Sequence, residues 1–342
     1  MDQRIKEALF YEKLKDSVKC GTCEKSCIIR KDKIGFCKTR KNIGGKIFTL
    51  IYGDISSMNV DKIEKKPFFH FFPRSNTLTV GSLGCNFTCP WCQNFGISKM
   101  SENIGKGEYV PPEKLIKLAV KQKCQGISIS YNEPVLLLEY SLDVFKLAKK
   151  ENLYNTYVSN GYMTSDALKT LVKSGLDAMN IDIKGDKNFV KKYCGADDEK
   201  ILRNVKEARK LGVWIELTTL VIPKFNDSVK SLRYVAKRIV DIDKNIPWHV
   251  SRFYPAWKFD NVPPTPSESL ERAYKIGKEE GLKFIYVGNI AGNKLESTYC
   301  PKCNEKLIER YGFEILKNKI KNGKCPKCKE KIPIVEYPRI SF

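Results

Sequence analysis

The run Gly84-Cys85-Asn86-Phe87-Thr88-Cys89-Pro90-Trp91-Cys92 holds three cysteines in the spacing C-x3-C-x2-C, with an aromatic residue just before the last one. An iron–sulfur cluster is normally held by four cysteine thiolates. Three thiolates this close in the chain can bind three irons of a four-iron cluster and leave the fourth iron without a protein ligand. We therefore interpret Cys85, Cys89 and Cys92 as an open metal site. A zinc knuckle that lacks one ligand, or three buried structural thiols, is the alternative.

Short apolar stretches alternate with amphipathic ones over residues 75–292. This alternation implies parallel βα units joined by right-handed crossovers. We predict an α/β fold with a partial (β/α)6 barrel, and a doubly wound open sheet is the alternative. Strands are expected at 78–83, 126–130, 156–159, 178–184, 213–221 and 248–253, with a further candidate at 284–287, and helices near 112–124, 135–150, 165–174, 198–211, 227–241 and 267–280.

Two more cysteine groups flank this region and define two smaller predicted units. The predicted domains are an N-terminal four-cysteine metal-binding unit (1–74), the barrel (75–292) and a C-terminal zinc-ribbon-like module (293–342). Thirteen cysteines, an odd number with tight C-x2-C pairs, favour metal over disulfides in a cytoplasmic chain. The N-terminal group comprises Cys20, Cys23, Cys27 and Cys37, and the C-terminal group Cys300, Cys303, Cys325 and Cys328.

The two groups differ in how clearly their spacing indicates a metal. The C-terminal group is two C-x2-C pairs, a pattern typical of structural tetrahedral zinc, with a rubredoxin-like iron as the alternative. The N-terminal spacing C-x2-C-x3-C-x9-C suits zinc or an auxiliary iron–sulfur cluster, because thiolates bind both metals. We expect the remaining Cys124 and Cys194 to be small buried hydrophobic side chains.

The ends of the chain and its charge limit the partners. The segment from Met1 to Glu7 does not resemble a signal peptide, and no apolar run approaches the ~18 residues of a membrane span. We expect a cytoplasmic protein with no membrane partner. The net charge of +22 raises the possibility of a nucleic-acid partner, but the lysines are scattered, which favours solvated helix faces. A basic, zinc-bearing RNA-binding or tRNA-modifying protein is nevertheless a second hypothesis.

Polar residues follow the predicted strands, at the end where a parallel barrel carries its site. The second strand ends in Tyr131-Asn132-Glu133-Pro134, which also suits a helix start. The third ends in Ser159-Asn160-Gly161, which by itself is an ordinary loop. On the fourth, Asn180, Asp182 and Lys184 alternate with apolar residues and share the face that looks into the barrel.

Charges inside a barrel are costly unless they are paired or meet a ligand. Asp182 and Lys184 therefore indicate either a binding site or an ion pair that only fills the core. On the fifth strand, Glu216 and Thr218 repeat the pattern more weakly. On the sixth, His249 is a candidate for the site, with a satisfied core histidine as an equal alternative.

Together these segments resemble the radical S-adenosylmethionine (radical SAM) superfamily over about residues 75–290. Tyr131-Asn132-Glu133-Pro134 is similar to its Gly-Gly-Glu-Pro segment, although Tyr and Asn replace the two glycines. Ser159-Asn160-Gly161 and Asp182-Ile183-Lys184 resemble SAM-binding segments of the pyruvate formate-lyase-activating branch. The cofactor contacts that the resemblance implies are Asn132, Glu133, Ser159, Asn160, Asp182, Lys184 and His249.

The whole chain more narrowly resembles the radical SAM member of the AmmeMemoRadiSam group. The matching features are the N-terminal cysteines with Gly35-Phe36-Cys37, the Cys92-Gln93-Asn94 run, the segment from Trp248 to Phe253, and the terminal ribbon.

The resemblance implies a 4Fe-4S cluster and SAM, an electron from ferredoxin or flavodoxin, and a 5′-deoxyadenosyl radical. That radical would take hydrogen from a small molecule or a partner protein. A glycyl-radical-enzyme activase is one such enzyme. Its usual His-Asn-Pro-Glu after the third cysteine is replaced here by Gln93-Asn94-Phe95-Gly96.

Overall fold

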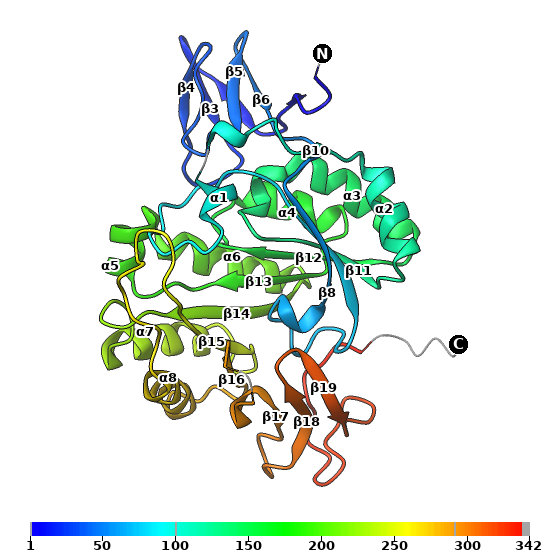
Figure 1. Ribbon diagram of the computed structural model, residues 1–342, viewed down its shortest axis with the longest axis vertical. Coiled ribbons are helices and arrows are strands. Elements are labelled where there is room, and N and C mark those ends of the chain that lie inside the picture. Colours follow the sequence, from blue (N-terminus) through cyan, green and yellow to red (C-terminus); the bar gives the residue numbers. More distant parts are fainter. Residues whose placement is uncertain (1, 100, 291, 337–342) are drawn as a thin grey trace.

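The computed structural model describes residues 2–99, 101–290 and 292–336. Small β-sheets formed by the N-terminal part lie at one end of a central α/β body, and a three-stranded ribbon lies at the other end (Figure 1). Residues 337–342 of the predicted C-terminal module lie outside the described residues. No described helix is long and apolar enough to cross a membrane.

The central body is built on an eight-stranded sheet with the order β16-β15-β14-β13-β12-β11-β9-β8. Seven strands pair in parallel and form a partial barrel, and β8 pairs antiparallel with β9. All seven predicted strands are confirmed. They are β9 (Asn76–Gly81), β11 (Gly126–Ile129), β12 (Tyr154–Ser159), β13 (Ala178–Asp182), β14 (Trp214–Val221), β15 (Trp248–Arg252) and β16 (Ile285–Gly288).

The eighth strand, β8 (Ser57–Lys62), was not expected from the sequence. Most of its side chains are exposed or half-buried, so its sequence lacks the apolar pattern of a central strand. Six residue pairs along β9 hold it instead, through backbone hydrogen bonds. Although it falls inside the predicted unit 1–74, it therefore belongs to the barrel sheet.

Amphipathic helices follow the strands and bury one face each against the sheet. The six predicted helices are confirmed as α2 (Pro112–Lys121), α3 (Leu138–Lys150), α4 (Ser165–Lys173), α6 (Asp198–Lys210), α7 (Val229–Val240) and α8 (Ser267–Glu279). Thr164 and Ser228 cap α4 and α7 by accepting a hydrogen bond from a first-turn backbone N–H. The short helices are η1 (Ile63–Lys65), α1 (Phe95–Ser98), η2 (Ser101–Asn103), η3 (Pro134–Leu137), α5 (Lys187–Phe189), the π-helix η4 (Val190–Cys194) and η5 (Lys294–Glu296).

The terminal units are made of short antiparallel strands. The N-terminal sheets are β1-β6-β5 and β2-β3-β4, a further pair joins β10 to β7, and the C-terminal ribbon is β17-β18-β19. Their bounds are β1 (Lys6–Glu7), β2 (Tyr11–Lys13), β3 (Ser17–Cys20), β4 (Ile28–Arg30), β5 (Arg40–Ile43), β6 (Lys46–Thr49), β7 (Asp54–Ile55), β10 (Glu108–Tyr109), β17 (Thr298–Tyr299), β18 (Lys306–Tyr311) and β19 (Glu314–Asn318).

The aromatic segment before β9 packs into the barrel and is fastened there by Glu216 of β14. The two carboxylate oxygens of Glu216 accept hydrogen bonds from the backbone N–H groups of Phe69 (2.9 Å) and His70 (2.8 Å). They also accept from Trp214 Nε1 (3.1 Å) and His249 Nε2 (2.7 Å). Burial opposes the charge on Glu216, but the bond from His249 and the other donors leave its pKa below the usual value.

His70 joins this segment to the C-terminal module as a neutral, fully buried ring. The carbonyl oxygen of Pro333 can only accept, so His70 Nδ1 donates to it at 2.6 Å, and Nε2 accepts from the Tyr286 hydroxyl. Burial lowers the pKa of His70 to about 4, although Glu216 favours the charged ring.

This buried histidine predicts a loss of stability in acid. The unfolded chain binds a proton at His70 below about pH 6.5, whereas the folded chain does so only near pH 4. Folding stability is therefore lost as the pH falls between these values, by roughly 3 kcal/mol. Urea unfolding of wild type and His70→Gln at pH 7, 5.5 and 4.5 measures it, and the wild type should lose more stability than the variant. If wild type and variant lose the same free energy of unfolding between pH 7 and 4.5, His70 is not the group responsible.

Candidate active site

The cysteine loop follows β9 and is clamped by Asn132 from the loop after β11. Asn132 Oδ1 accepts a hydrogen bond from Ser82 N at 3.0 Å. Its Nδ2 donates to the carbonyl oxygens of Leu83 and Gly84, both at 3.1 Å. An amide can accept and donate at once, so one side chain fixes the backbone just before Cys85. The structure thus places Asn132 against the metal loop.

The loop thiols are buried or half-buried, and both lysines and carboxylates lie near them. Burial raises the pKa of Cys85 to about 12. A hydrogen bond with Cys194 lowers the pKa of Cys89 to about 7 against the effect of burial, and Lys184 and Lys99 lower it further. Metals bind the thiolate form of cysteine. The nearby cations therefore favour the form in which Cys89 acts as a ligand.

Cys194 lies closer to this loop than its sequence position suggested. It is fully buried, as expected, but its Sγ is 3.6 Å from Cys89 Sγ. The two cysteines are 105 residues apart, so no local spacing pattern could have linked them.

Glu133 is buried beside the cysteine loop and joins two strand ends. Its carboxylate accepts hydrogen bonds from Ser159 Oγ (2.8 Å), Asn160 N (2.8 Å) and Val135 N (3.2 Å). Burial raises the pKa of Glu133 to about 7, and these hydrogen bonds limit the rise. Because Val135 lies in η3, the same carboxylate caps a helix start and faces the site, so the two interpretations are compatible.

Asn160 connects this carboxylate to the cysteine loop. Its Nδ2 donates to Oδ1 of Asn86, the residue after Cys85, at 2.7 Å. The next residue, Gly161, has a φ of +71°, and a Cβ there would lie 2.8 Å from a side-chain carbon of Ile181. The turn expected from the sequence therefore requires glycine, since both the conformation and the space exclude larger residues.

Asp182 and Lys184 form an ion pair at the C-terminal end of β13. Lys184 Nζ is 2.9 Å from Asp182 Oδ2, and the side chains are 17% and 30% exposed, respectively. Burial disfavours the charge on Lys184, but Asp182 and the nearby thiols raise its pKa overall. The pair reaches the cavity and does not merely fill a closed core.

Tyr131 stands where the resemblance would place a glycine, and it adopts a glycine-like backbone. Its φ is +70°, which is rare and costly for a bulky residue. The phenol hydroxyl donates to Asp61 Oδ2 (3.1 Å) and accepts from Asn59 Nδ2 (3.2 Å), both on β8. Asn94 Nδ2 donates to the Tyr131 carbonyl oxygen at 2.7 Å. The unexpected strand β8 thus helps to hold the strained turn.

One cavity of about 370 Å³ brings these groups together at the carboxyl ends of the strands. Its size falls within the roughly 300–1,000 Å³ of small-molecule sites. Several of its polar residues were not predicted, among them Lys66, Lys99 and Ser251. The predicted residues that line it are Cys85, Cys89, Cys92, Asn132, Glu133, Ser159, Asn160, Asp182 and Lys184.

His249 is not among the residues that line this cavity. Its ring is bonded to the buried carboxylate of Glu216 and packs edge-on against Phe69, with ring centres 4.8 Å apart. These contacts favour the alternative, a satisfied core histidine, and a cofactor contact of His249 stays a prediction. Asn180 is likewise tied inside the barrel, to the carbonyl oxygen of Pro67 and the hydroxyl of Thr218.

The cysteine groups differ in how tightly their sulfur atoms cluster. Among the described residues, Cys300, Cys303, Cys325 and Cys328 are the only such set whose ligand atoms all lie within 4.8 Å of one another. Their closest pairs are 3.5 and 3.7 Å apart. A tetrahedral zinc with Zn–S of about 2.3 Å needs sulfurs roughly 3.8 Å apart. The C-terminal quartet therefore fits a single tetrahedral ion.

This geometry predicts that the C-terminal quartet binds about one zinc atom per chain. The double variant Cys300→Ser/Cys325→Ser in the full chain should lose that zinc and keep its iron. Metal analysis by mass spectrometry measures both, with Cys124→Ser as the matched control for loss of a buried thiol. A loss of iron with zinc unchanged would contradict the zinc assignment.

The three loop cysteines form a wider set than the C-terminal quartet, since they do not meet the same 4.8 Å criterion. Thiolates that bind separate irons of one cluster must stand further apart than those on one ion. One buried and two half-buried thiols, nearby cations and an adjoining cavity with a carboxylate and a lysine therefore fit a four-iron cluster with an open iron and an amino-acid ligand. A zinc knuckle would require sulfur atoms roughly 3.8 Å apart, as around a single tetrahedral ion.

The chain belongs to the radical SAM superfamily, and it is an enzyme of the radical SAM class. The model of this superfamily matches residues 79–234. An uncharacterized protein of Methanocaldococcus jannaschii is 42% identical over 311 residues, which cover 90% of this chain and 92% of that protein. The pyruvate formate-lyase-activating enzyme of Clostridium pasteurianum is 24% identical over 180 residues, or 48% of this chain and 72% of that enzyme. The chain is thus related to the activase branch.

The fold also resembles a solved structure of the same class. The crystal structure of a radical SAM methyltransferase from Sphaerobacter thermophilus matches with a TM-score of 0.51 and 12% identity, over 65% of this chain and 68% of that one. At this identity the likeness supports the fold alone.

Proposed function

We propose that the protein cleaves SAM reductively and uses the resulting radical to take a hydrogen atom from a small-molecule or protein substrate in the cytoplasm. A 4Fe-4S cluster bound by Cys85, Cys89 and Cys92 would supply the electron for that cleavage, after reduction by ferredoxin or flavodoxin. The observation that carries the proposal is the convergence of these thiols, Glu133 and Asp182 on one cavity.

The chain's own groups suit the parts of SAM. Glu133 has a pKa of about 7, so the ammonium group of a methionyl ligand would draw it into the carboxylate form. Ser159 and the backbone of Asn160 hold that carboxylate in place. Asp182 offers an acceptor for ribose hydroxyls, and Lys184 offers a cation for the methionyl carboxylate.

Aromatic side chains pack around Trp91 of the cysteine loop, and this apolar cluster would limit the access of water from that side. Trp91, just before Cys92, stacks on Phe189 with ring centres 5.0 Å apart and contacts Phe259 at 5.8 Å. Phe259 packs in turn on Phe225 at 4.5 Å. Since these rings come from distant segments, the aromatic cluster forms only in the folded chain.

The test is 5′-deoxyadenosine formation by the anaerobically reconstituted full chain with SAM and dithionite. We expect this product, together with methionine, at a rate above that of free cluster and SAM. A protein shown to hold the cluster and to bind SAM, but that forms no product with either dithionite or reduced flavodoxin, would contradict the proposal.

A glycyl-radical activase is the second candidate, and the relation to the Clostridium pasteurianum enzyme supports it. The altered run after Cys92 counts against it, since Gln93 lines the cavity and Asn94 is bonded to the Tyr131 turn. An activase should generate a glycyl radical in a partner protein, detectable by electron paramagnetic resonance.

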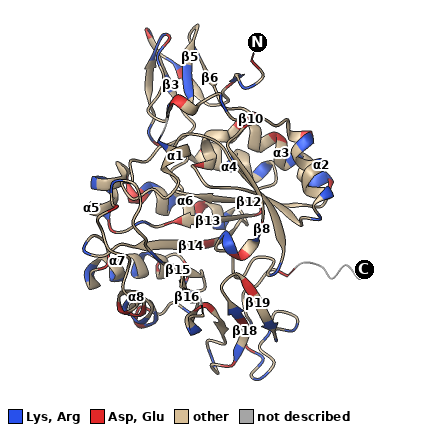
Figure 2. Cartoon of the chain, in the orientation of Figure 1, with Lys and Arg blue, Asp and Glu red and all other residues tan. Residues whose placement is uncertain are grey.

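The RNA-binding hypothesis receives less support. Figure 2 shows lysine and arginine distributed over several helices and both terminal units, with acidic residues between them. Many of these cations are paired on the surface, such as Arg233 with Glu279 and Arg238 with Glu199. A nucleic-acid footprint would instead gather unpaired cations on one face.

A further inference from the structure

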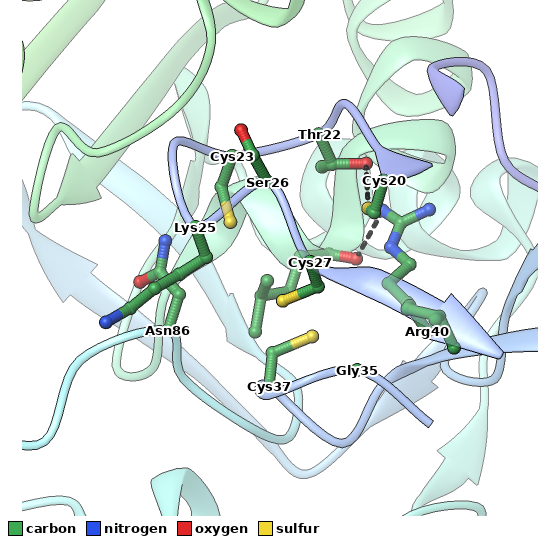
Figure 3. Close-up of a pocket in the computed structure, with 12 residues that line it drawn as sticks. Cys20, Thr22, Cys23, Lys25, Ser26, Cys27, Gly35, Cys37, Arg40 and Asn86 are labelled. Carbon is green, nitrogen blue, oxygen red and sulfur yellow. Dashed lines mark hydrogen bonds between the residues drawn. The ribbon is translucent and has the colours of Figure 1, made fainter. Parts of the chain in front are cut away.

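The four N-terminal cysteines line one pocket beside the active-site loop. Cys20 ends β3, Cys23 pairs with Met163 in an isolated bridge, and Cys37 lies in the turn before β5. Figure 3 shows the sulfur atoms of Cys23, Cys27 and Cys37 facing a common space, with Cys20 at its side. The fold thus assembles all four predicted ligands.

Their sulfur atoms are less closely gathered than those of the C-terminal quartet. Among the described residues, no three of the four N-terminal sulfur atoms lie mutually within 4.8 Å, whereas all four C-terminal ones do. A single zinc ion requires sulfurs roughly 3.8 Å apart. A cluster places each thiolate on a different iron, so the same four residues must stand further apart.

Two buried nitrogen donors line this pocket. Asn86 is fully buried; burial raises the pKa of the neighbouring Cys23 thiol, and a hydrogen bond from Asn86 partly offsets that rise. Arg40 is 1% exposed; its Nη1 donates to Glu139 at 2.8 Å, but its Nε is unbonded within the described chain. Both line the pocket. Buried N–H groups are normally satisfied, and thiolates or sulfides of an anionic cluster would accept from them.

The pocket adjoins the active site through the same loop that holds Cys85. A Cβ on Gly84 would lie 2.7 Å from the carbonyl oxygen of Cys37, so the two cysteine segments touch at their backbones. Asn86 spans both sites, since its Oδ1 accepts from Asn160 while its Nδ2 stands at the N-terminal pocket. A metal group here would contact the frame of the active-site loop.

We propose that Cys20, Cys23, Cys27 and Cys37 bind a second, four-iron cluster and not a zinc ion. The spacing of the thiols, the buried donors Asn86 and Arg40 that line the pocket, and the closeness to the Cys85 loop support this choice. The assignment does not depend on SAM cleavage, because it concerns a site with its own complete set of four ligands.

The test removes the three active-site cysteines and measures the iron and sulfide that the chain still binds. The full-length variant Cys85→Ala/Cys89→Ala/Cys92→Ala, reconstituted anaerobically, should retain about four irons and four sulfides per chain, with Mössbauer parameters of a 4Fe-4S cluster. Adding Cys20→Ala and Cys27→Ala should remove them. A triple variant that holds zinc at the N-terminal quartet and no sulfide would overturn the proposal, as would about four irons with four sulfides that survive the five substitutions.

A second measurement covers the case in which the triple variant does not fold. Wild type should then hold about eight irons and eight sulfides per chain, and Cys20→Ala/Cys27→Ala about half. About four irons in both would overturn the proposal. Failure of the proposed function would appear differently, as wild type with both clusters and no 5′-deoxyadenosine.

Discussion

Replacing Cys89 by alanine should reduce 5′-deoxyadenosine formation to background while the chain stays folded. Even residues that only support a metal ligand are worth about 10–100-fold in affinity or activity, so loss of a ligand from a three-cysteine site should exceed that range. The side chain is buried among Cys194, Lys184 and Lys99, and alanine leaves a small cavity there. The measurement is product formed from SAM and dithionite, with circular dichroism for folding.

The matched control for this variant is Cys124→Ala, which also removes a buried thiol. Cys124 lies just before β11, at the opposite end of the strand from the site. The Cys124→Ala variant should therefore form 5′-deoxyadenosine at the wild-type rate. Full activity in Cys89→Ala would remove Cys89 from the ligand set. Equal loss in both variants would mean that thiol removal acts through stability and not through the cluster.

Replacing Glu216 by alanine should lower the free energy of unfolding by about 3–5 kcal/mol, as expected when one partner of a buried charged network is removed. The change leaves the backbone N–H groups of Phe69 and His70 buried without an acceptor, each at a cost of about 1–3 kcal/mol. It also leaves His249 and Trp214 unpaired. Urea unfolding at pH 7 measures the loss.

A surface carboxylate provides the comparison. Glu309 pairs with Lys306 at 2.9 Å but is 39% exposed, so Glu309→Ala should cost no more than about 1 kcal/mol. If the two variants lose similar free energy of unfolding, the Glu216 network does not stabilise the barrel more than a surface ion pair does. His249→Gln, if folded, should still bind SAM, because His249 lies outside the cavity. Loss of SAM binding without unfolding would support the original prediction for His249.

The regular elements were predictable because their patterns are local. Buried parallel strands are short apolar runs, and the helices over them repeat their apolar residues every three to four positions. Strand β8 could not be predicted in this way because backbone pairing along β9 holds it and few of its side chains are buried. Predicted site residues at strand ends converged for a similar reason, since the carboxyl ends of parallel strands share one edge.

Residues whose role depends on distant partners could not be assigned. The alternation along β15 places His249 inside the barrel, but only the fold shows that Glu216 and Phe69 meet it there. The position of Cys194 against Cys89 arises from the turn of η4 onto the cysteine loop. Tyr131 adopts a glycine-like φ because residues on β8 hold its hydroxyl.

The sequence by itself determined the class of this protein: three cysteines at C-x3-C-x2-C, alternating strands and helices, and polar groups after the strands, all of which are local patterns. The tertiary structure alone decided how far apart the sulfur atoms of each cysteine group stand and which buried donors face them. For the N-terminal group, the ligand spacing along the chain suits either a zinc ion or a cluster, because both bind thiolates. Only the distances between those thiolates, which folding sets, distinguish one metal from four.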